Sequence, residues 1–169
     1  KKAFKWYRIA AEQGISAAQY SVGYLYDMGW GVPQDYKKAF KWYRVAAEQG
    51  HAEAQYSVGH LYDMGLGVPQ DYVLAHMWFS LSGLQGYQDA RESRNATENK
   101  MTPQQIEEAQ KMAVTFSGEI NGKAEVTEGN AKEDLEKGAL ATTLWKQVLY
   151  NIKEAIDNID PPPLRLSWG

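Results

Sequence analysis

The 169-residue sequence contains no cysteine, only three histidines and no long apolar run. The absence of cysteine excludes disulfide bonds and cysteine-ligated zinc. No apolar stretch approaches the roughly 18 residues that a membrane-spanning helix needs. A net charge of −3 gives no general reason to expect nucleic-acid binding. The sequence also begins without methionine or a signal peptide, so we expect either a processed chain or a fragment.

Motifs for catalysis are absent as well. No metal-ligand spacing such as His-Glu-x-x-His surrounds His51, His60 or His76. No serine begins a Ser-x-x-Lys motif, and no Gly-x-Ser-x-Gly elbow exists. The glycine pair at Gly29 and Gly31 follows a predicted helix, whereas phosphate-binding glycines follow a strand. We therefore predict no enzyme, no cofactor and no catalytic or metal-ligating residue.

The sequence does contain a repeat with a period of 36 residues. Residues 1–36 align with residues 37–72 and differ at six positions, which leaves 30 identical. A third copy begins at Val73 and then diverges. A fixed period of this size indicates a repeat architecture.

Each period predicts two helices that form a hairpin. The first runs from about 17 to 28, with Ala18, Val22 and Leu25 on one face. Gly23 lies in its middle, and this choice costs about 1 kcal/mol relative to alanine, so it suggests a close helix crossing. Because one hairpin cannot bury both of its faces, the copies are expected to stack into a solenoid.

The second helix is expected between an N-cap at Asp35 and a left-handed residue at Gly50. Its buried stripe comprises Ala39, Trp42, Tyr43 and Ala46. Its opposite side comprises Lys37, Lys41, Arg44 and Glu48. We interpret this basic side as a solvated surface with an Arg44–Glu48 pair, and a patch for an anionic partner is the alternative.

These residues follow the pattern A-x-x-x-V-G-x-x-Y, then G-x-G-V-x-x-D-Y-x-K-A-x-x-W-x-x-x-A-A-x-x-G. In the first copy the pattern is carried by Ala18, Val22, Gly23, Tyr26, Gly29, Gly31, Val32, Asp35, Tyr36, Lys38, Ala39, Trp42, Ala46, Ala47 and Gly50. It resembles the Sel-1-like repeat, a relative of the tetratricopeptide repeat, over about residues 1–90. The resemblance implies an all-α, right-handed superhelical α/α solenoid. The array would occupy residues 1–117, with a truncated first repeat that leaves Trp6 and Tyr7 partly uncovered.

The chain beyond residue 90 is expected to close the array and then extend past it. A polar helix at 87–98 and a cap helix at 102–116, with a Thr102–Gln105 capping box, would end the solenoid. Residues 118–132 are predicted to form a flexible linker, and a short hairpin is the alternative. Residues 133–169 are predicted to form a long amphipathic helix followed by a proline-rich tail. The helix would dock on its own solenoid, exchange with another molecule, or bind a membrane surface.

The predicted function is a non-catalytic adaptor or scaffold that binds a protein or peptide. By the resemblance, the first helix of each repeat lines the concave side of the solenoid. The predicted binding residues on it are Ala17, Tyr20, Ser21, Tyr24, Met28, Glu53, Tyr56, Ser57, His60 and Met64. Two of the six differences between the copies, Ala17/Glu53 and Tyr24/His60, fall on this face; drift on an unconstrained surface is the alternative.

Other partners are predicted as follows. We expect no nucleic acid and no membrane insertion. A self-associating structural protein, in which the C-terminal helix packs on the same or a neighbouring chain, is the alternative function and would give a homo-oligomer. Some relatives have been linked to β-lactam binding, but the serine motifs for that chemistry are missing. The resemblance favours a bacterial protein that is periplasmic or secreted and leaves the cytoplasm open.

Overall fold

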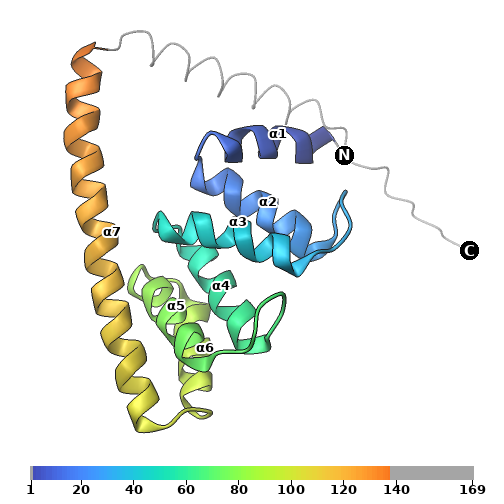
Figure 1. Cartoon of the computed structure of the whole chain (residues 1–169), viewed down its shortest axis with the longest axis vertical. Coiled ribbons are helices and arrows are strands. Elements are labelled where there is room, and N and C mark those ends of the chain that lie inside the picture. Colours follow the sequence, from blue (N-terminus) through green and yellow to red (C-terminus); the bar gives the residue numbers. More distant parts are fainter. Residues whose placement is uncertain (1, 138–169) are drawn as a thin grey trace, which may run out of the picture. The chain divides into compact units, whose positions relative to one another are not determined.

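The computed structural model describes residues 2–137 of the chain, with side chains described for 4–120, and in this range it is built of α-helices and connecting loops (Figure 1). The helices are α1 (Lys2–Glu12), α2 (Ser16–Met28), α3 (Tyr36–Glu48), α4 (Ala52–Met64), α5 (Tyr72–Leu84), α6 (Gln88–Glu98) and α7 (Pro103–Lys137). The chain divides into two compact units, 1–123 and 124–169. The second unit contributes the end of α7 to the described residues, and most of the predicted C-terminal helix and tail lies outside them.

The capping residues read from the sequence fix the ends of the helices. The Asp35 and Asp71 carboxylates accept the backbone N–H groups of Lys38 and Leu74, each at 3.0 Å. At the other end, α2 and α4 stop at glycines in the left-handed region, with φ of 69° at Gly29 and 67° at Gly65. The predicted hairpin is therefore confirmed in both of the near-identical copies.

Successive helices pack against one another in chain order from α1 to α6, as a solenoid of hairpins requires. The crossing within each hairpin is close. A Cβ atom at Gly23 would lie 2.6 Å from the Tyr43 ring, and one at Gly59 would lie 2.7 Å from the Phe79 ring. A glycine is therefore required in the middle of the first helix, because an aromatic ring of the second helix fills the space that any larger side chain would need.

Buried glutamines hold each hairpin to the next. The Gln19 amide donates to the carbonyl oxygen of Ala11 at 3.2 Å, and its Oε1 accepts from the Gln49 amide at 2.6 Å. The same two bonds recur one period later at Gln55, Ala47 and Gln85. Because the glutamines are buried, these bonds satisfy polar groups that would otherwise destabilise the fold. Sequence analysis did not identify this network.

The repeated tryptophan is buried only in the third copy. Trp6 is 60% exposed, Trp42 is half-buried and Trp78 is 5% exposed. The prediction of partly uncovered Trp6 and Tyr7 is confirmed. Trp78 is buried because Phe116 of α7 packs edge-on against it, with ring centroids 5.1 Å apart.

The helix α7 begins as predicted and continues further than predicted. In the capping box, Gln105 N–H donates to the Thr102 hydroxyl at 3.3 Å and Thr102 N–H donates to the Gln105 side chain at 2.9 Å. Ala109 and Ala113 are buried on its inner face. The helix then runs on to Lys137 through the stretch expected to be a linker. Three glycines weaken this stretch, but it contains no proline and is rich in Ala, Glu and Lys, which favour helix.

The polar helix α6 replaces apolar contacts of the earlier copies by polar ones. In the first two copies a phenylalanine packs edge-on against a tyrosine, Phe4 against Tyr26 and Phe40 against Tyr62, with centroids 5.4 and 5.3 Å apart. In the third copy the equivalent positions are held by His76 and Glu98. Their side chains are linked through His76 Nε2 and Glu98 Oε1 at 2.8 Å.

Candidate interaction surface

The ten predicted binding residues lie on α2 and α4, and none of them is fully buried. We call this set the first-helix face. Its exposed members are Ala17, Met28, Glu53, His60 and Met64, and its half-buried members are Tyr20, Ser21, Tyr24, Tyr56 and Ser57. The two serine hydroxyls donate to the carbonyl oxygens four residues earlier, each at 2.9 Å. Because these hydroxyl protons are already bound, the serines offer a partner mainly acceptor oxygens.

Aromatic side chains form a continuous run along α2 and across to α4. Trp30 packs edge-on against Tyr24, with ring centroids 5.5 Å apart. Tyr24 lies 6.3 Å from Tyr20, and Tyr20 stacks on His51 at 5.0 Å. These separations lie in the range of favourable aromatic pairs. The run therefore joins the end of one repeat to the beginning of the next.

A second run follows one period later. His60 lies 6.5 Å from Tyr56, and Tyr56 lies 5.1 Å from Tyr87. Tyr56 also contacts Phe79 of α5 at 5.6 Å, which anchors its ring against the core. Contacts with the core thus fix the Tyr56 ring, and part of the side chain remains exposed to solvent.

Sequence reasoning missed three members of these runs: Trp30, His51 and Tyr87. A signal for two of them was present, because Ile15/His51 and Trp30/Leu66 are among the six differences between the first two copies. Tyr87 occupies the position of His51 one period later. The missed residues precede or follow the helices, so helical periodicity did not group them with the first-helix face.

The tyrosine hydroxyls sit in an electronegative environment. Burial raises the pKa of Tyr20, and the nearby Tyr87 phenol and Glu53 carboxylate raise it further. Burial also raises the pKa of Tyr87, with added contributions from Asp89, Tyr56 and Glu53. Glu53 therefore contributes to the raised pKa of both tyrosines, although they come from different repeats.

The opposite, basic side of α3 is paired as predicted. Arg44 Nε lies 2.7 Å from Glu48 Oε1, and the equivalent Arg8 and Glu12 atoms are 2.8 Å apart. A shallow groove of about 600 Å³ on this side is lined by Lys37, Phe40, Lys41, Arg44, Val45, Glu48 and Gly67. Exposed ion pairs of this kind contribute little binding or stability by themselves.

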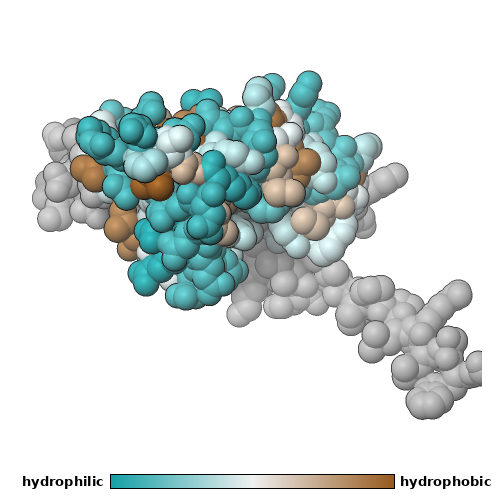
Figure 2. All heavy atoms as spheres, turned by 90° about the horizontal axis from the view of Figure 1, so that it is seen from below, coloured by the Kyte–Doolittle hydropathy of each residue, from teal (hydrophilic) through white to brown (hydrophobic). Residues whose placement is uncertain are grey.

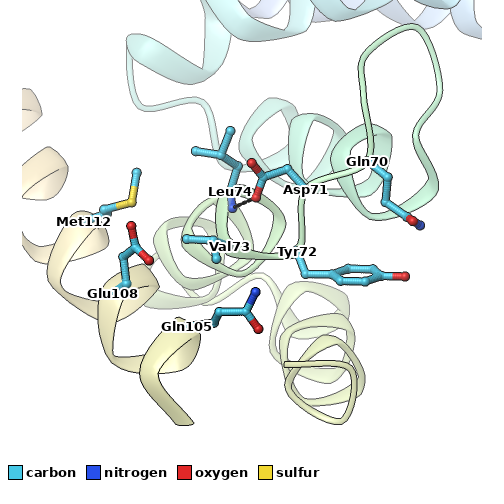
Figure 3. A pocket seen from close by; sticks show the side chains of 8 residues that line it. All are labelled: Gln70, Asp71, Tyr72, Val73, Leu74, Gln105, Glu108 and Met112. Carbon is cyan, nitrogen blue, oxygen red and sulfur yellow. Dashed lines mark hydrogen bonds between the residues drawn. The ribbon is translucent and has the colours of Figure 1, made fainter. Parts of the chain in front are cut away.

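A smaller pocket lies where the start of α5 faces α7 (Figure 3). It has a volume of about 480 Å³ and is lined by Gln70, Asp71, Tyr72, Val73, Leu74, Gln105, Glu108 and Met112. The Asp71 carboxylate in it already caps α5 through its bond to Leu74 N–H. This carboxylate therefore already has a structural role.

Two absences can be stated for the described residues. Among residues 2–137, no cluster of three His, Cys, Asp or Glu side chains is placed to hold a metal ion. Within the same part of the chain, no helix has both the length and the apolar character to span a membrane. The surface seen in Figure 2 is mostly hydrophilic, with separate hydrophobic patches.

The stacked helical hairpins define the chain as an all-α solenoid of tandem repeats. The family model of the Sel1 repeat matches residues 1–15, 16–51 and 52–87, just over half of the chain. The chain therefore belongs to the Sel1 repeat family. Proteins built of these repeats generally act as non-catalytic scaffolds for protein interactions. No curated protein sequence matches the chain significantly.

Two solved structures support this assignment. One is the crystal structure of c5321, a protective antigen present in uropathogenic Escherichia coli strains that displays an SLR fold. It is 36% identical, with a TM-score of 0.69 over 76% of this chain and 28% of that chain. The other is a Sel1 repeat protein from Oxalobacter formigenes, 37% identical, with a TM-score of 0.52 over 54% of this chain and 37% of that chain. The present chain thus spans well under half the length of either relative.

Proposed function

We propose that this protein is a non-catalytic adaptor that binds a protein or peptide on the first-helix face. The observation that carries the proposal is the pair of aromatic runs that crosses this face from one repeat to the next. Tyrosine and tryptophan are enriched at binding hot spots because they bring a large contact area at a low entropic cost.

The other members of the face suit the same role. Met28 is 45% exposed and Met64 is 56% exposed, at equivalent positions of the two copies. Exposed methionines are flexible and polarisable, so they adapt to partners of different shape. Rigid aromatic rings beside adaptable methionines favour a peptide or protein segment as the ligand over a small molecule, which would need a deeper pocket.

The test is a double substitution, Tyr24→Ala with His60→Ala, in the full chain. Proteins captured from a lysate by the immobilised wild-type chain are identified, and the affinity of each is then measured with purified components. We expect the double variant to weaken a genuine partner by about 1 to 3 kcal/mol. Its free energy of unfolding should stay within about 1 kcal/mol of the wild type, since both side chains are exposed or half-buried.

A matched control is Val45→Ala with Leu84→Ala. These two apolar side chains are also exposed, but they lie outside the first-helix face. The control variant should bind as the wild type does. Equal weakening by both variants, or by neither, would remove the proposed site from this face.

Self-association is the second candidate function. The observation that favours it is the exposure of Trp6, Tyr7 and Ile9 on α1. Light scattering of the full chain decides between the two, because a monomer at high concentration eliminates self-association. The C-terminal helix through which it was predicted lies largely outside the described residues.

A further inference from the structure

The two aromatic runs have equivalent ends at successive repeat junctions, one period apart. Tyr20 and His51 end one run, and Tyr56 and Tyr87 end the other. Glu53, in the first turn of α4, lies beside His51 and one helical turn before Tyr56. We call these five residues the junction cluster: Tyr20, His51, Glu53, Tyr56 and Tyr87.

The Glu53 carboxylate has no cationic partner in the cluster. Its Oε2 lies 3.3 Å from His51 Nδ1. That nitrogen, however, accepts the backbone N–H of Ala54, at 3.4 Å, as the N-cap of α4. A neutral imidazole nitrogen that accepts one hydrogen bond cannot donate another, so His51 in this state leaves the Glu53 charge uncompensated.

Elsewhere in the array some carboxylates are paired with a lysine or arginine and others are not. On the outer sides of α1, α3 and α7, the carboxylates of Glu12, Glu48 and Glu107 each lie within 2.8 Å of a lysine or arginine four residues away. Among the side chains of residues 4–120, Asp27, Asp71, Glu92 and Glu108 have no lysine or arginine within ion-pair distance. The same holds for Glu53 and Asp89, each in the first turn of its helix. The first-turn position of these acids favours their helices, but it does not neutralise them.

Tyrosine rings next to an uncompensated carboxylate favour a cation. The face of an aromatic ring attracts a guanidinium or ammonium group placed within about 6 Å, and a nearby carboxylate adds a charge-assisted hydrogen bond. Arginine fits best, because its planar guanidinium both stacks on a ring and forms two parallel bonds to a carboxylate.

Building on the proposed function, we infer that the junction cluster binds a cationic side chain, foremost arginine, of an extended partner peptide. Apolar residues on either side of this arginine then lie on the aromatic runs, one toward Tyr24 and Trp30 and the other toward His60. The negative charges of Glu53 and Asp89 supply the complementarity that selects a basic peptide over a neutral or acidic one.

The test uses the full chain and two labelled, capped peptides, Gly-Ser-Pro-Leu-Arg-Leu-Pro-Ser-Gly and the same sequence with citrulline in place of arginine. Citrulline has nearly the same shape but no charge. Fluorescence anisotropy at low salt should show the arginine peptide binding about fivefold or more tightly. The preference should shrink at high salt, where charges are screened. It should disappear in the Glu53→Gln variant.

The control variant is Glu107→Gln, which removes an exposed and already paired carboxylate of α7. It should leave the preference for arginine unchanged. Circular dichroism of each variant establishes that the helices are retained.

The outcomes separate this inference from the proposed function. Equal binding of both peptides, lost in the Tyr24→Ala, His60→Ala variant, would overturn the arginine inference and keep the binding face. An arginine preference that survives both Glu53→Gln and the double alanine variant would place binding elsewhere and overturn both. If the arginine peptide does not bind at millimolar concentration, the arginine inference is overturned. The first-helix face is then tested separately with the partners that the full chain captures.

Discussion

At the scale of single residues, a tyrosine hydroxyl present in the second copy is missing from the equivalent position of the third. The Tyr43 hydroxyl donates to Asp27 Oδ2 at 3.0 Å. Phe79 occupies the equivalent position without a hydroxyl. The carboxylate equivalent to Asp27 is therefore free for other bonds, and Asp63 binds Lys100 at 3.0 Å and Thr97 at 3.2 Å. Where phenylalanine replaces tyrosine, the aspartate thus bonds to Thr97 of α6 and to Lys100.

The buried Tyr43 hydroxyl predicts a loss of stability at alkaline pH. Burial, together with the Asp27 charge, raises the pKa of Tyr43 above its ordinary 10.0. Above about pH 10 the unfolded chain releases this proton while the folded chain keeps it, so the free energy of unfolding falls as pH rises. Tyr43→Phe should cost about 1 kcal/mol at pH 7, through the lost hydrogen bond. Urea denaturation from pH 7 to 11 should show the two curves converging; parallel curves would contradict this account.

The pair of His76 and Glu98 predicts a strong coupling between two substitutions. His76 is 1% exposed, so Glu98→Tyr alone leaves its Nε2 without a partner and should cost about 1 to 3 kcal/mol. Adding His76→Phe restores the phenylalanine–tyrosine pair of the earlier copies. The double variant should recover about 1 to 2 kcal/mol of that loss in chemical denaturation. Strictly additive single effects would show that the two positions do not interact.

At the scale of elements, α7 makes the contribution of the repeated tryptophan to stability differ from copy to copy. Phe116 covers Trp78, while among the side chains of residues 4–120 no aromatic ring is paired in this way with Trp6 or Trp42. Gly50, at the end of α3, lies close to Ile120, so α7 also reaches the second hairpin. The end of the array is therefore closed by a helix that packs through a few side chains.

This cover predicts a graded series of alanine substitutions. Trp78→Ala should cost roughly 3 to 5 kcal/mol, because it empties a buried site. Trp42→Ala should cost roughly 2 kcal/mol and Trp6→Ala less than about 1 kcal/mol, since progressively less area is lost. The measurement is the urea midpoint and the far-UV circular dichroism signal of each variant. Equal losses at all three sites would contradict the assigned role of α7.

At the scale of the whole molecule, the described array is a chain of nearest-neighbour contacts, so its local stability should vary along its length. The centre, from α3 to α5, contains most of the large buried side chains, among them Tyr43, Leu61 and Phe79. The helix α1 packs mainly on α2 and exposes Trp6 and Tyr7. The two regions should therefore open with different free energies.

Hydrogen exchange of the full chain measures this difference. Backbone amides of α1 should exchange at least about tenfold faster than those of α3 to α5, since fewer buried contacts must break to open it. Equal protection throughout would mean that α1 is covered, as by a second copy of the chain, and would support self-association.

The sequence by itself determined the period, the hairpin, the helix caps and the family. These features depend on neighbours within one period: Asp35 caps the helix that follows it, and Gly29 ends the helix that precedes it. The surface position of the first-helix face also followed from helical spacing. Its role in binding remains a proposal, because spacing reveals exposure and not a ligand.

Only the tertiary structure decided the contacts between segments that lie far apart in the sequence. The stacking of Tyr20 on His51, the bond between His76 and Glu98 and the burial of Trp78 under Phe116 each join distant segments. The helical course of residues 118–132 was missed because glycines lower local helix propensity, and the helix that precedes them was not seen to continue. Local propensity is a weak term that an established helix overrides, whereas capping bonds act within one turn and can be read directly.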